Sequence, residues 1–299
     1  MRSSGARRRL DAELVRRGLA PSRHQAVELV ERGLVLVRGA VAGTPARLVA
    51  DAEPIVVDSR VRRFVSRGGD KLEAALARFA ITVDGKRCLD AGASTGGFTD
   101  CLLSHGAAHV VAVDVAHGML HPRLRDDPKV TLLERTNLRH LDLAATGDIR
   151  FDVVVADLSF ISLTVVVEVL ARELPVPGAD LVLLVKPQFE VGKEVARRGR
   201  GVVKDSTERR GALERVASAL VSSGASIMGA MASPLLGPAG NAEYFLHARA
   251  LFAAPARASA VPDALLDAAI GASPDIHTGT VAGTQPHLSE AGQMLREDR

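Results

Sequence analysis

Aromatic residues are scarce in this chain, which has no tryptophan, one tyrosine and 8 phenylalanines among its 299 residues. In the N-terminal part, Phe64 is the only aromatic side chain. Recognition of nucleic acid by stacking bases on aromatic rings is therefore not expected there. Cysteine is equally scarce. Cys88 and Cys101 both fall in apolar segments, which favours a reduced cytosolic compartment over a disulfide scaffold.

Long apolar runs are also missing. The most apolar window, Val153 to Ala171, is interrupted by Asp157 and Glu168, so it lacks the composition of a membrane span. The N-terminus is basic and soon becomes amphipathic, and it has no apolar stretch typical of a secretory signal. We therefore expect a cytoplasmic protein.

The net charge of the whole chain is only +3, but its charges are unevenly distributed. Residues 1–71 contain 15 lysines and arginines against 8 aspartates and glutamates, a difference of +7, whereas the remainder has 23 against 27, a difference of −4. A basic segment ahead of a near-neutral body is typical of a polyanion-binding module attached to another domain. The length and the apolar content of 47% allow one large domain or two smaller ones.

The stretch from Cys88 to Thr99 has the pattern of a strand, a tight turn and a helix. Asp90 closes a short apolar run and glycines follow it, and glycine lets the backbone approach a ligand closely. A second apolar run, His109 to Val113, ends at Asp114. An acidic residue about 20 positions after a glycine loop is the usual ribose-binding arrangement of nucleotide-binding α/β folds.

The spacing within this loop narrows the choice of ligand. Ala93 and Ser94 follow Gly92, so the pattern is not the G-x-G-x-x-G of dinucleotide folds, and pyrophosphate binding is the weaker interpretation. An aspartate two positions before the first glycine suits a ligand with a cationic centre and no phosphate, such as S-adenosylmethionine. A glycine-rich turn in an ordinary α/β protein is the alternative. The candidate cofactor-binding residues are Asp90, Gly92, Ala93, Ser94, Thr95, Gly96, Gly97, Phe98, Asp114, Asn137 and Asp157.

The rest of the chain indicates a sheet of buried strands. Apolar runs predict strands at 130–133, 151–157, 181–186, 227–232 and 241–246. The second of these is nearly continuous in apolar residues, as expected of a strand covered on both faces. Asp157 and Lys186 close two of the runs, where ligand and catalytic groups gather in open α/β sheets. We predict a Rossmann-like, seven-stranded α/β domain preceded by a small α+β domain.

Two lysines and two carboxylates form the candidate catalytic set: Lys71, Asp157, Lys186 and Glu243. Lys71 leads into a predicted helix, Leu72 to Phe79, and we place it in the first turn of that helix, where the helix dipole disfavours a cation. Contact with a substrate would explain this position, and a solvated surface is the alternative. The set suits chemistry at a ribose 2′-hydroxyl, because a lysine serves as base when desolvation and a neighbouring cation lower its pKa. A surface salt-bridge network is the commoner fate of such charges.

The N-terminal segment predicts two short helices followed by a small sheet. Its runs Arg9-Leu10-Asp11, Gly18-Leu19-Ala20 and Gly33 to Val37 resemble the RNA-binding domain named after small-subunit ribosomal protein S-four. The resemblance implies phosphate contacts, which position a protein without reading sequence. Each arginine taken alone could equally lie on a solvated helix face. The implied RNA-binding residues are Arg8, Arg9, Arg16, Arg23 and Arg32.

Five further runs are long and specific: Ser66-Arg67-Gly68, Leu89 to Thr99, Ala156 to Ser162, Lys186 to Lys193, and Gly240-Asn241 with Glu243-Tyr244-Phe245. They resemble the FtsJ-type ribose methyltransferases and, across roughly residues 7–250, the TlyA family. The resemblance implies S-adenosylmethionine-dependent 2′-O-methylation of cytidine in ribosomal RNA of the small subunit, the large subunit or both. It implies that Lys71, Asp157, Lys186 and Glu243 form a catalytic tetrad with Lys186 as base. The implied partners are ribosomal RNA and ribosomal subunits, without a metal or an obligate protein partner.

The chain departs from the family in one motif. Mycobacterial members carry Arg-x-Trp-Val in the linker, whereas this sequence has Arg62-Arg63-Phe64-Val65, and phenylalanine lacks the indole N–H donor. We predict an RNA-binding domain at 1–60, a basic linker at 61–67, a methyltransferase domain at 68–256 and a disordered tail at 257–299.

Two other functions are possible on the sequence. The first is an RNA-binding protein with a vestigial enzyme domain, which would have no affinity for S-adenosylmethionine. The second is a hemolysin-type membrane-active protein, a label that the TlyA family has carried. That function needs an apolar span or a strongly amphipathic membrane helix, and neither is visible in the sequence.

Overall fold

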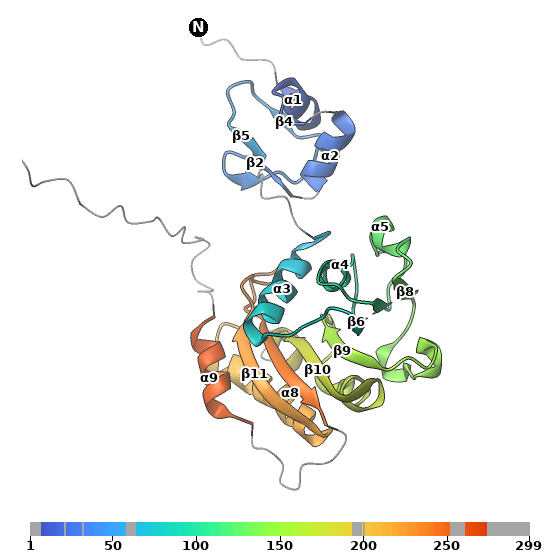
Figure 1. Cartoon of the computed structure of the whole chain (residues 1–299). Helices are drawn as coiled ribbons and strands as arrows, with labels where there is room; N and C mark the ends of the chain where they lie inside the picture. Colours follow the sequence, from blue (N-terminus) through green and yellow to red (C-terminus); the bar gives the residue numbers. More distant parts are fainter. Residues whose placement is uncertain are drawn as a thin grey trace, which may run out of the picture.

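The computed structural model describes residues 7–20, 22–31, 33–57, 64–192, 199, 201–251 and 261–273 (Figure 1). Several predictions fall elsewhere: Arg32 as an RNA contact, Arg62 and Arg63 in the linker, and residues 257–260 and 274–299 in the tail. These residues lie outside the described ones. Within the described residues, the elements form two modules, one before residue 58 and one after residue 63.

The N-terminal module combines two helices with short antiparallel strands. Its elements are β1 (Arg8–Arg9), α1 (Leu10–Arg16), α2 (Arg23–Glu31), β2 (Val35–Val37), β3 (Ala40–Val41), β4 (Leu48–Val49) and β5 (Ile55–Val57). β2 lies between β3 and β5, and β1 pairs with β4. Leu10 and Leu14 of α1 share one buried apolar cluster with Ala26 and Val30 of α2 and with Val35. The predicted small α+β domain is therefore confirmed.

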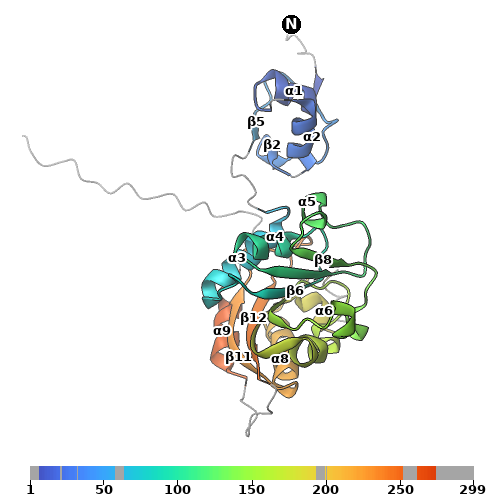
Figure 2. The ribbon, with the colours of Figure 1, turned by 45° about the vertical axis from the view of Figure 1, so that its right-hand side comes forward.

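The second module is built on a seven-stranded sheet with the order β11-β12-β10-β9-β6-β7-β8 (Figures 1 and 2). Its strands are β6 (Arg87–Ala91), β7 (His109–Val113), β8 (Val130–Leu133), β9 (Phe151–Ala156), β10 (Pro175–Val185), β11 (Ala225–Ala232) and β12 (Tyr244–Ala250). Neighbouring strands are parallel except at β12, which is antiparallel to both β10 and β11. This topology confirms the predicted Rossmann-like, seven-stranded domain.

Long helices cover both faces of this sheet. α3 (Arg67–Phe79) and α4 (Gly97–Ser104) share an apolar cluster with one face, and α8 (Ser206–Ser222) and α9 (Asp263–Gly271) share another cluster with the opposite face. Side chains of β9 alternate between these clusters, with Val153 and Val155 in the first and Val154 and Ala156 in the second. This double coverage explains the continuous apolar run. The shorter elements are α5 (Pro122–Arg125), η1 (Leu138–His140), η2 (Ala144–Thr146), η3 (Leu163–Val165), η4 (Val169–Glu173) and α6 (Pro187–Glu190).

The strand register brings four chain segments to one edge of the sheet. Ala91 pairs with Ala156, so the glycine loop after β6 and the loop after β9 leave the sheet side by side. β12 runs in the opposite direction and pairs its first residue, Tyr244, with the last residue of β10, Val185. Lys186 therefore follows β10 at the same edge at which Glu243 precedes β12.

The start of α3 differs from the prediction. The helix begins at Arg67 and is capped by Ser66, whose Oγ accepts a hydrogen bond from the Gly68 amide at 3.3 Å. Lys71 is thus the fifth helical residue and lies beyond the first turn, so the argument from the helix dipole was wrong. Gly68 and Gly69 disfavour a helix, so the sequence pattern placed the start of α3 too late. A Cβ on Gly69 would collide with the ring of Phe64, so this glycine allows close packing within a helix.

Phe64 and α9 both belong to the packed body of the second module. Phe64, predicted to lie in the linker, is 1% exposed and joins the cluster beneath α3 and α4. In the predicted tail, α9 buries Leu266 and Ala269 in the cluster of the opposite face, so this part of the tail is folded. Its amphipathic pattern is short, but α9 finds an apolar surface on β11 and α8.

The structure agrees with the sequence on the lack of long apolar segments among the described residues and on the burial of the two cysteines. Among the described residues, no helix is both long and apolar enough to cross a membrane. The side chains of Cys88 and Cys101 are buried in the cluster beneath α3 and α4. Burial raises the pKa of the Cys88 thiol to about 12, as expected of a core residue.

Candidate active site

The glycine loop between β6 and α4 passes close to the end of β9. Gly92 has a φ of +87°, and a Cβ at this position would lie 2.7 Å from the carbonyl oxygen of Asp157. Gly96 also has a positive φ, +97°, just before α4. Glycine is therefore required at Gly92 both by the backbone conformation and by the neighbouring strand end.

Asp114 fixes the other side of the loop. One of its carboxylate oxygens accepts a hydrogen bond from the Ser94 amide and the other from the Ala116 amide, both at 2.7 Å. A carboxylate oxygen can accept a second hydrogen bond, so Asp114 retains acceptor capacity toward a ligand.

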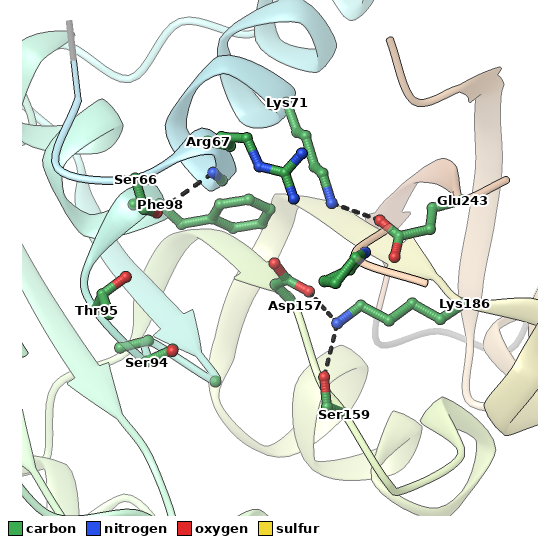
Figure 3. A pocket seen from close by; sticks show the side chains of 15 residues that line it. Ser66, Arg67, Lys71, Ser94, Thr95, Phe98, Asp157, Ser159, Lys186 and Glu243 are labelled. Carbon is green, nitrogen blue, oxygen red and sulfur yellow. Dashed lines mark hydrogen bonds and ion pairs between the residues drawn. The ribbon is translucent and has the colours of Figure 1, made fainter. Parts of the chain in front are cut away.

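Two cavities meet at this loop, and both are lined by Gly92, Ser94, Asp157 and Ser159. The first, of about 320 Å³, extends toward the start of α3 (Figure 3). Its other lining residues are Ser66, Arg67, Gly68, Lys71, Ala93, Thr95, Gly97, Phe98, Lys186, Pro238 and Glu243. The second, of about 360 Å³, extends toward β7. Its other lining residues are Val113, Asp114, Val115, Ala116, Thr136, Asn137, Leu138, Leu158, Phe160 and Ile161.

The four members of the predicted catalytic set line the first cavity as two ion pairs. Lys71 Nζ lies 2.5 Å from Glu243 Oε2, and Lys186 Nζ lies 2.6 Å from Asp157 Oδ1 (Figure 3). Lys186 Nζ also donates a hydrogen bond to Ser159 Oγ at 2.8 Å. The side chains of Lys71 and Glu243 are only 8% and 1% exposed. Four charges scattered through the sequence thus meet in one cavity, and they do not form a solvated surface network.

Most predicted cofactor residues line one or both cavities, but Asp90 and Gly96 line neither. A Cβ on Gly96 would meet Leu120 and Leu124, so Gly96 shapes the turn from beneath. Asp90 is fully buried under the loop, where Oδ2 accepts a hydrogen bond from Thr99 Oγ1 at 2.6 Å. Its Oδ1 has no hydrogen-bond partner among the described residues.

The environment of Asp90 is unusual for a carboxyl group. Burial raises its pKa to about 7, against the lowering effect of the Thr99 hydroxyl, and the nearby Asp157 and Asp114 raise it further. A cationic group bound close to the loop would favour the ionised form. The orphaned oxygen and the raised pKa both fit a ligand that carries positive charge and no phosphate.

Several site residues were missed by the sequence reasoning. Ser159 holds Lys186, and Ser66, Arg67 and Pro238 line the first cavity. Arg67 and Lys71 are four positions apart on α3, which places them on one helix face. Once α3 is known to begin at Arg67, this spacing indicates that Arg67 lies beside Lys71 and is a site residue.

Glu190 was also missed as an individual residue. Its carboxylate accepts hydrogen bonds from Ser162 Oγ at 2.5 Å and from the Leu163 amide at 2.8 Å. It thereby ties α6, which follows Lys186, to the loop that follows Asp157. Burial raises the pKa of Glu190, opposed by its bonds to Ser162 and Leu163.

Four of the five arginines predicted to bind RNA lie on β1, α1 and α2 of the N-terminal module: Arg8, Arg9, Arg16 and Arg23. Their side chains are 46–63% exposed, and each contacts a buried carboxylate of α1. Arg17, at the end of α1, donates to the carbonyl oxygens of Asp51 and Glu53 and has a structural role. Among the described residues, no cluster of histidine, cysteine and carboxylate side chains could hold a metal ion.

Comparison with known proteins identifies relatives over both modules. Residues 64–250 match the family model of FtsJ-like methyltransferases, and residues 8–53 match that of the S4 domain. The chain is 55% identical over 245 residues to the 16S/23S rRNA (cytidine-2′-O)-methyltransferase TlyA of Mycobacterium tuberculosis, covering 81% of this chain and 90% of that protein. It is 38% identical over 240 residues to Hemolysin A of Brachyspira hyodysenteriae, covering 80% and 98%. A solved structure from Streptococcus thermophilus, described as a hemolysin, is 35% identical with a TM-score of 0.69, covering 89% of this chain and 95% of that one.

Proposed function

Because the chain belongs to the TlyA family of FtsJ-like methyltransferases, we propose that it transfers a methyl group from S-adenosylmethionine to the 2′-hydroxyl of cytidine in ribosomal RNA. The observation that carries this proposal is the meeting of two lysine–carboxylate pairs with the glycine loop in one cavity. The similarity to an enzyme whose name specifies cytidine-2′-O-methylation of ribosomal RNA supports the substrate. The S4 domain match supports RNA as the partner of the N-terminal module.

The residues around the loop fit S-adenosylmethionine. Gly92 lines both cavities and lets the loop lie against the end of β9, and Asp114 has acceptor capacity for ribose hydroxyls. Asn137 and Leu138 line the cavity beyond Asp114 and would contact the adenine. Asp90 lies below the loop with an orphaned oxygen. The cofactor, when bound, supplies an electrophilic methyl group on a sulfonium.

Lys186 is the proposed general base. Asp157 and Ser159 hold its Nζ at the wall of the first cavity, next to the loop. A ribose 2′-hydroxyl is a weak nucleophile, so it must lose its proton to a nearby base as it attacks. Lys186 would first release one proton from Nζ to solvent, and the resulting amine would then accept the proton of the hydroxyl while Asp157 keeps Nζ in place. Positioned proton transfer of this kind contributes roughly 10²–10⁴-fold to a rate.

Lys71 and Glu243 complete the proposed tetrad. Their pair joins α3 to the start of β12 across the cavity, and its near-complete burial keeps both side chains fixed. Lys71 would orient the ribose or the neighbouring phosphate, and Glu243 would fix Lys71. Orientation of the hydroxyl oxygen toward the methyl group supplies much of the remaining rate enhancement.

The direct test is transfer of label from radioactive S-adenosylmethionine to separated small and large ribosomal subunits from a strain lacking this protein. Wild type should label RNA, Lys186→Ala should lose transfer while keeping cofactor affinity by calorimetry, and Lys129→Ala should behave as wild type. Lys129 is an exposed lysine outside both cavities and serves as the matched control. Normal transfer by Lys186→Ala would overturn the assignment of the base.

The same experiment separates the alternatives. A vestigial enzyme domain predicts neither label nor cofactor binding by wild type. The hemolysin names of two relatives suggest membrane lysis as a second candidate. Addition of purified, lipid-free protein to erythrocytes tests it, and the methyltransferase proposal predicts that no haemoglobin is released.

A further inference from the structure

Two buried carboxylates lie beneath the exposed arginines of the N-terminal module. Asp11 and Glu13, both on α1, are 2% and 1% exposed although each carries a charge. Above them lie four arginines, which we call the arginine array: Arg8, Arg9, Arg16 and Arg23. Charged residues are rarely buried unless they are paired, so the carboxylates need these arginines to remain in the interior.

Asp11 connects the two helices of the module. Its Oδ2 accepts hydrogen bonds from Arg9 Nη2 at 2.9 Å and from Arg23 Nη2 at 3.0 Å, and its Oδ1 accepts from the Ala12 amide at 2.7 Å. Arg9 precedes α1 and Arg23 begins α2. One carboxylate oxygen therefore fixes two guanidinium groups from different elements next to each other.

Glu13 holds Arg16 in a two-point contact. Its Oε2 accepts from Arg16 Nε at 2.8 Å and its Oε1 from Arg16 Nη2 at 2.6 Å. Arg8 Nη1 lies 4.0 Å from Oε2. A two-point contact fixes the plane of the guanidinium as well as its position.

The array keeps its outer surface available. The side chains of Arg8, Arg9, Arg16 and Arg23 remain 47%, 50%, 46% and 63% exposed, whereas their carboxylate partners are inside. Hydrogen bonding to the arginines lowers the pKa of Asp11 and of Glu13 to about 2, so both carboxylates stay charged at neutral pH. The face therefore presents donors whose conformational freedom is already restricted, which reduces the entropy lost on binding.

We propose that Asp11 and Glu13 are positioning residues that hold the arginine array in place for the phosphates of the RNA backbone. This inference rests on the proposed function of the N-terminal module in binding ribosomal RNA. Two negative charges thus strengthen the binding of a polyanion. The competing view treats them as ordinary acidic residues that weaken the attraction, and it predicts the opposite sign on their removal.

Asp51 provides a matched control on the same face. Its side chain is 61% exposed and contacts Arg16 and Arg8 from the solvent side. An exposed carboxylate is poorly suited to hold an arginine in place and competes with phosphate for it. Asp51→Asn and Asp11→Asn remove the same charge from the same module, but positioning predicts opposite effects on RNA affinity.

The test measures binding of the full-length protein to total ribosomal RNA from a strain lacking the protein. The salt concentration is varied from roughly 50 to 200 mM, a range over which binding through phosphate contacts weakens steeply. We expect Asp11→Asn to weaken binding roughly tenfold and to flatten the plot of log affinity against log salt by about 1 to 2. Asp51→Asn should tighten binding, up to about fivefold. Asp11→Glu keeps the charge but displaces the carboxylate, so it should also weaken binding.

Unchanged or tighter binding by Asp11→Asn, with Asp11→Glu equal to wild type, would overturn the positioning role. Thermal unfolding and the affinity for S-adenosylmethionine, measured on the same variants, show whether the fold is intact. The salt slope distinguishes lost phosphate contacts from a general loss of folded protein, because misfolding lowers the amount bound without changing the slope. If wild type itself does not bind ribosomal RNA, the proposed function fails, and not merely the role of Asp11.

Discussion

At the scale of single residues, the site depends on charged groups that are kept away from water. Glu243 and Lys71 pair inside the cavity wall, and Asp90 lies under the glycine loop with one oxygen unpaired. Burial of such groups costs free energy unless they are paired. The arrangement is therefore better explained by function than by stability, and substitutions should separate the two.

Asp90 gives a prediction with a definite pH dependence. Because burial raises its pKa from 3.8 to about 7, the folded protein binds this proton more tightly than the unfolded chain does. Asp90 therefore lowers the free energy of unfolding progressively as the pH rises from about 4 to about 7. Above that range the destabilisation is complete. Asp90→Asn removes the ionisation. We expect it to be more stable than wild type by roughly 1–3 kcal/mol at pH 8.

Thermal unfolding of cofactor-free protein at a series of pH values checks this prediction. The difference in unfolding free energy between Asp90→Asn and wild type should shrink toward a pH of about 4.5. At that pH the Asp90 carboxyl of the folded wild type is protonated, so it is uncharged like the amide of the variant. The same variant should bind S-adenosylmethionine more weakly at pH 8. A stability difference that does not change with pH would show that Asp90 is not the titrating group.

The buried Lys71–Glu243 pair gives a second prediction. Glu243→Ala leaves the ammonium of Lys71 buried without its partner, and such a loss typically costs about 3–5 kcal/mol. The double variant Lys71→Met, Glu243→Gln removes both charges and should lose much less. Denaturant unfolding of both variants measures the difference, and equal losses would mean that Lys71 reaches solvent when Glu243 is absent.

The residues of the site were more predictable than their partners. Asp157 and Lys186 end apolar runs, so their place at the edge of the sheet follows from the strand pattern. The pairing of Asp157 with Lys186 does not follow from that pattern. The contact of Lys71 with Glu243 does not follow from it either, because 172 positions separate these residues and the antiparallel β12 brings them together. The burial of Asp11 and Glu13 could not be predicted, because nothing in their spacing indicates that arginines cover them.

At the scale of elements, the ends of β9 and β10 and the start of β12 place charged side chains in one cavity, and the glycine loop lies beside the end of β9. The strand β8 begins and ends at the predicted residues, whereas β10 extends back to Pro175 with an irregular register between Pro175 and Asp180. That extension could not be predicted because proline and glycine interrupt the apolar pattern. α3 was predicted to begin late for a similar reason, since Gly68 and Gly69 disfavour a helix until Phe64 is packed on them.

The glycine loop can be tested against a matched position. Gly92 and Gly85 have similar positive φ values of +87° and +70°, but a Cβ would collide with Asp157 only at Gly92, and Gly85 has open space. Gly85→Ala should therefore cost about 1–2 kcal/mol from backbone conformation alone. Gly92→Ala should cost more and should also weaken S-adenosylmethionine binding. Unfolding free energy and calorimetry check both variants, and equal losses with unchanged cofactor affinity would count against the close approach of the two strand ends.

At the scale of the whole molecule, charge and chemistry are divided between the modules. Residues 1–57 contain 10 lysines and arginines against 6 aspartates and glutamates, a net of +4, whereas the remainder has 28 against 29, a net of −1. RNA binding through phosphate contacts weakens steeply with salt, while a cofactor held by hydrogen bonds and cavity walls responds weakly. We expect the KM for ribosomal RNA to rise at least about tenfold when the salt concentration increases from roughly 50 to 200 mM. Over the same range the Kd for S-adenosylmethionine should change less than about twofold. Parallel changes in both would argue that one module binds both ligands.

Methyl transfer to the 2′-oxygen of cytidine, catalysed in the cavity of the two lysine–carboxylate pairs, would leave a modified nucleoside in ribosomal RNA. The most direct measurement is mass spectrometry of nucleosides from ribosomal RNA of a strain lacking the protein, complemented with wild type or with Lys186→Ala. We expect 2′-O-methylcytidine to appear with wild type and to stay absent with Lys186→Ala at equal protein levels. A methyl group on a base, or 2′-O-methylcytidine restored equally by both proteins, would contradict this expectation.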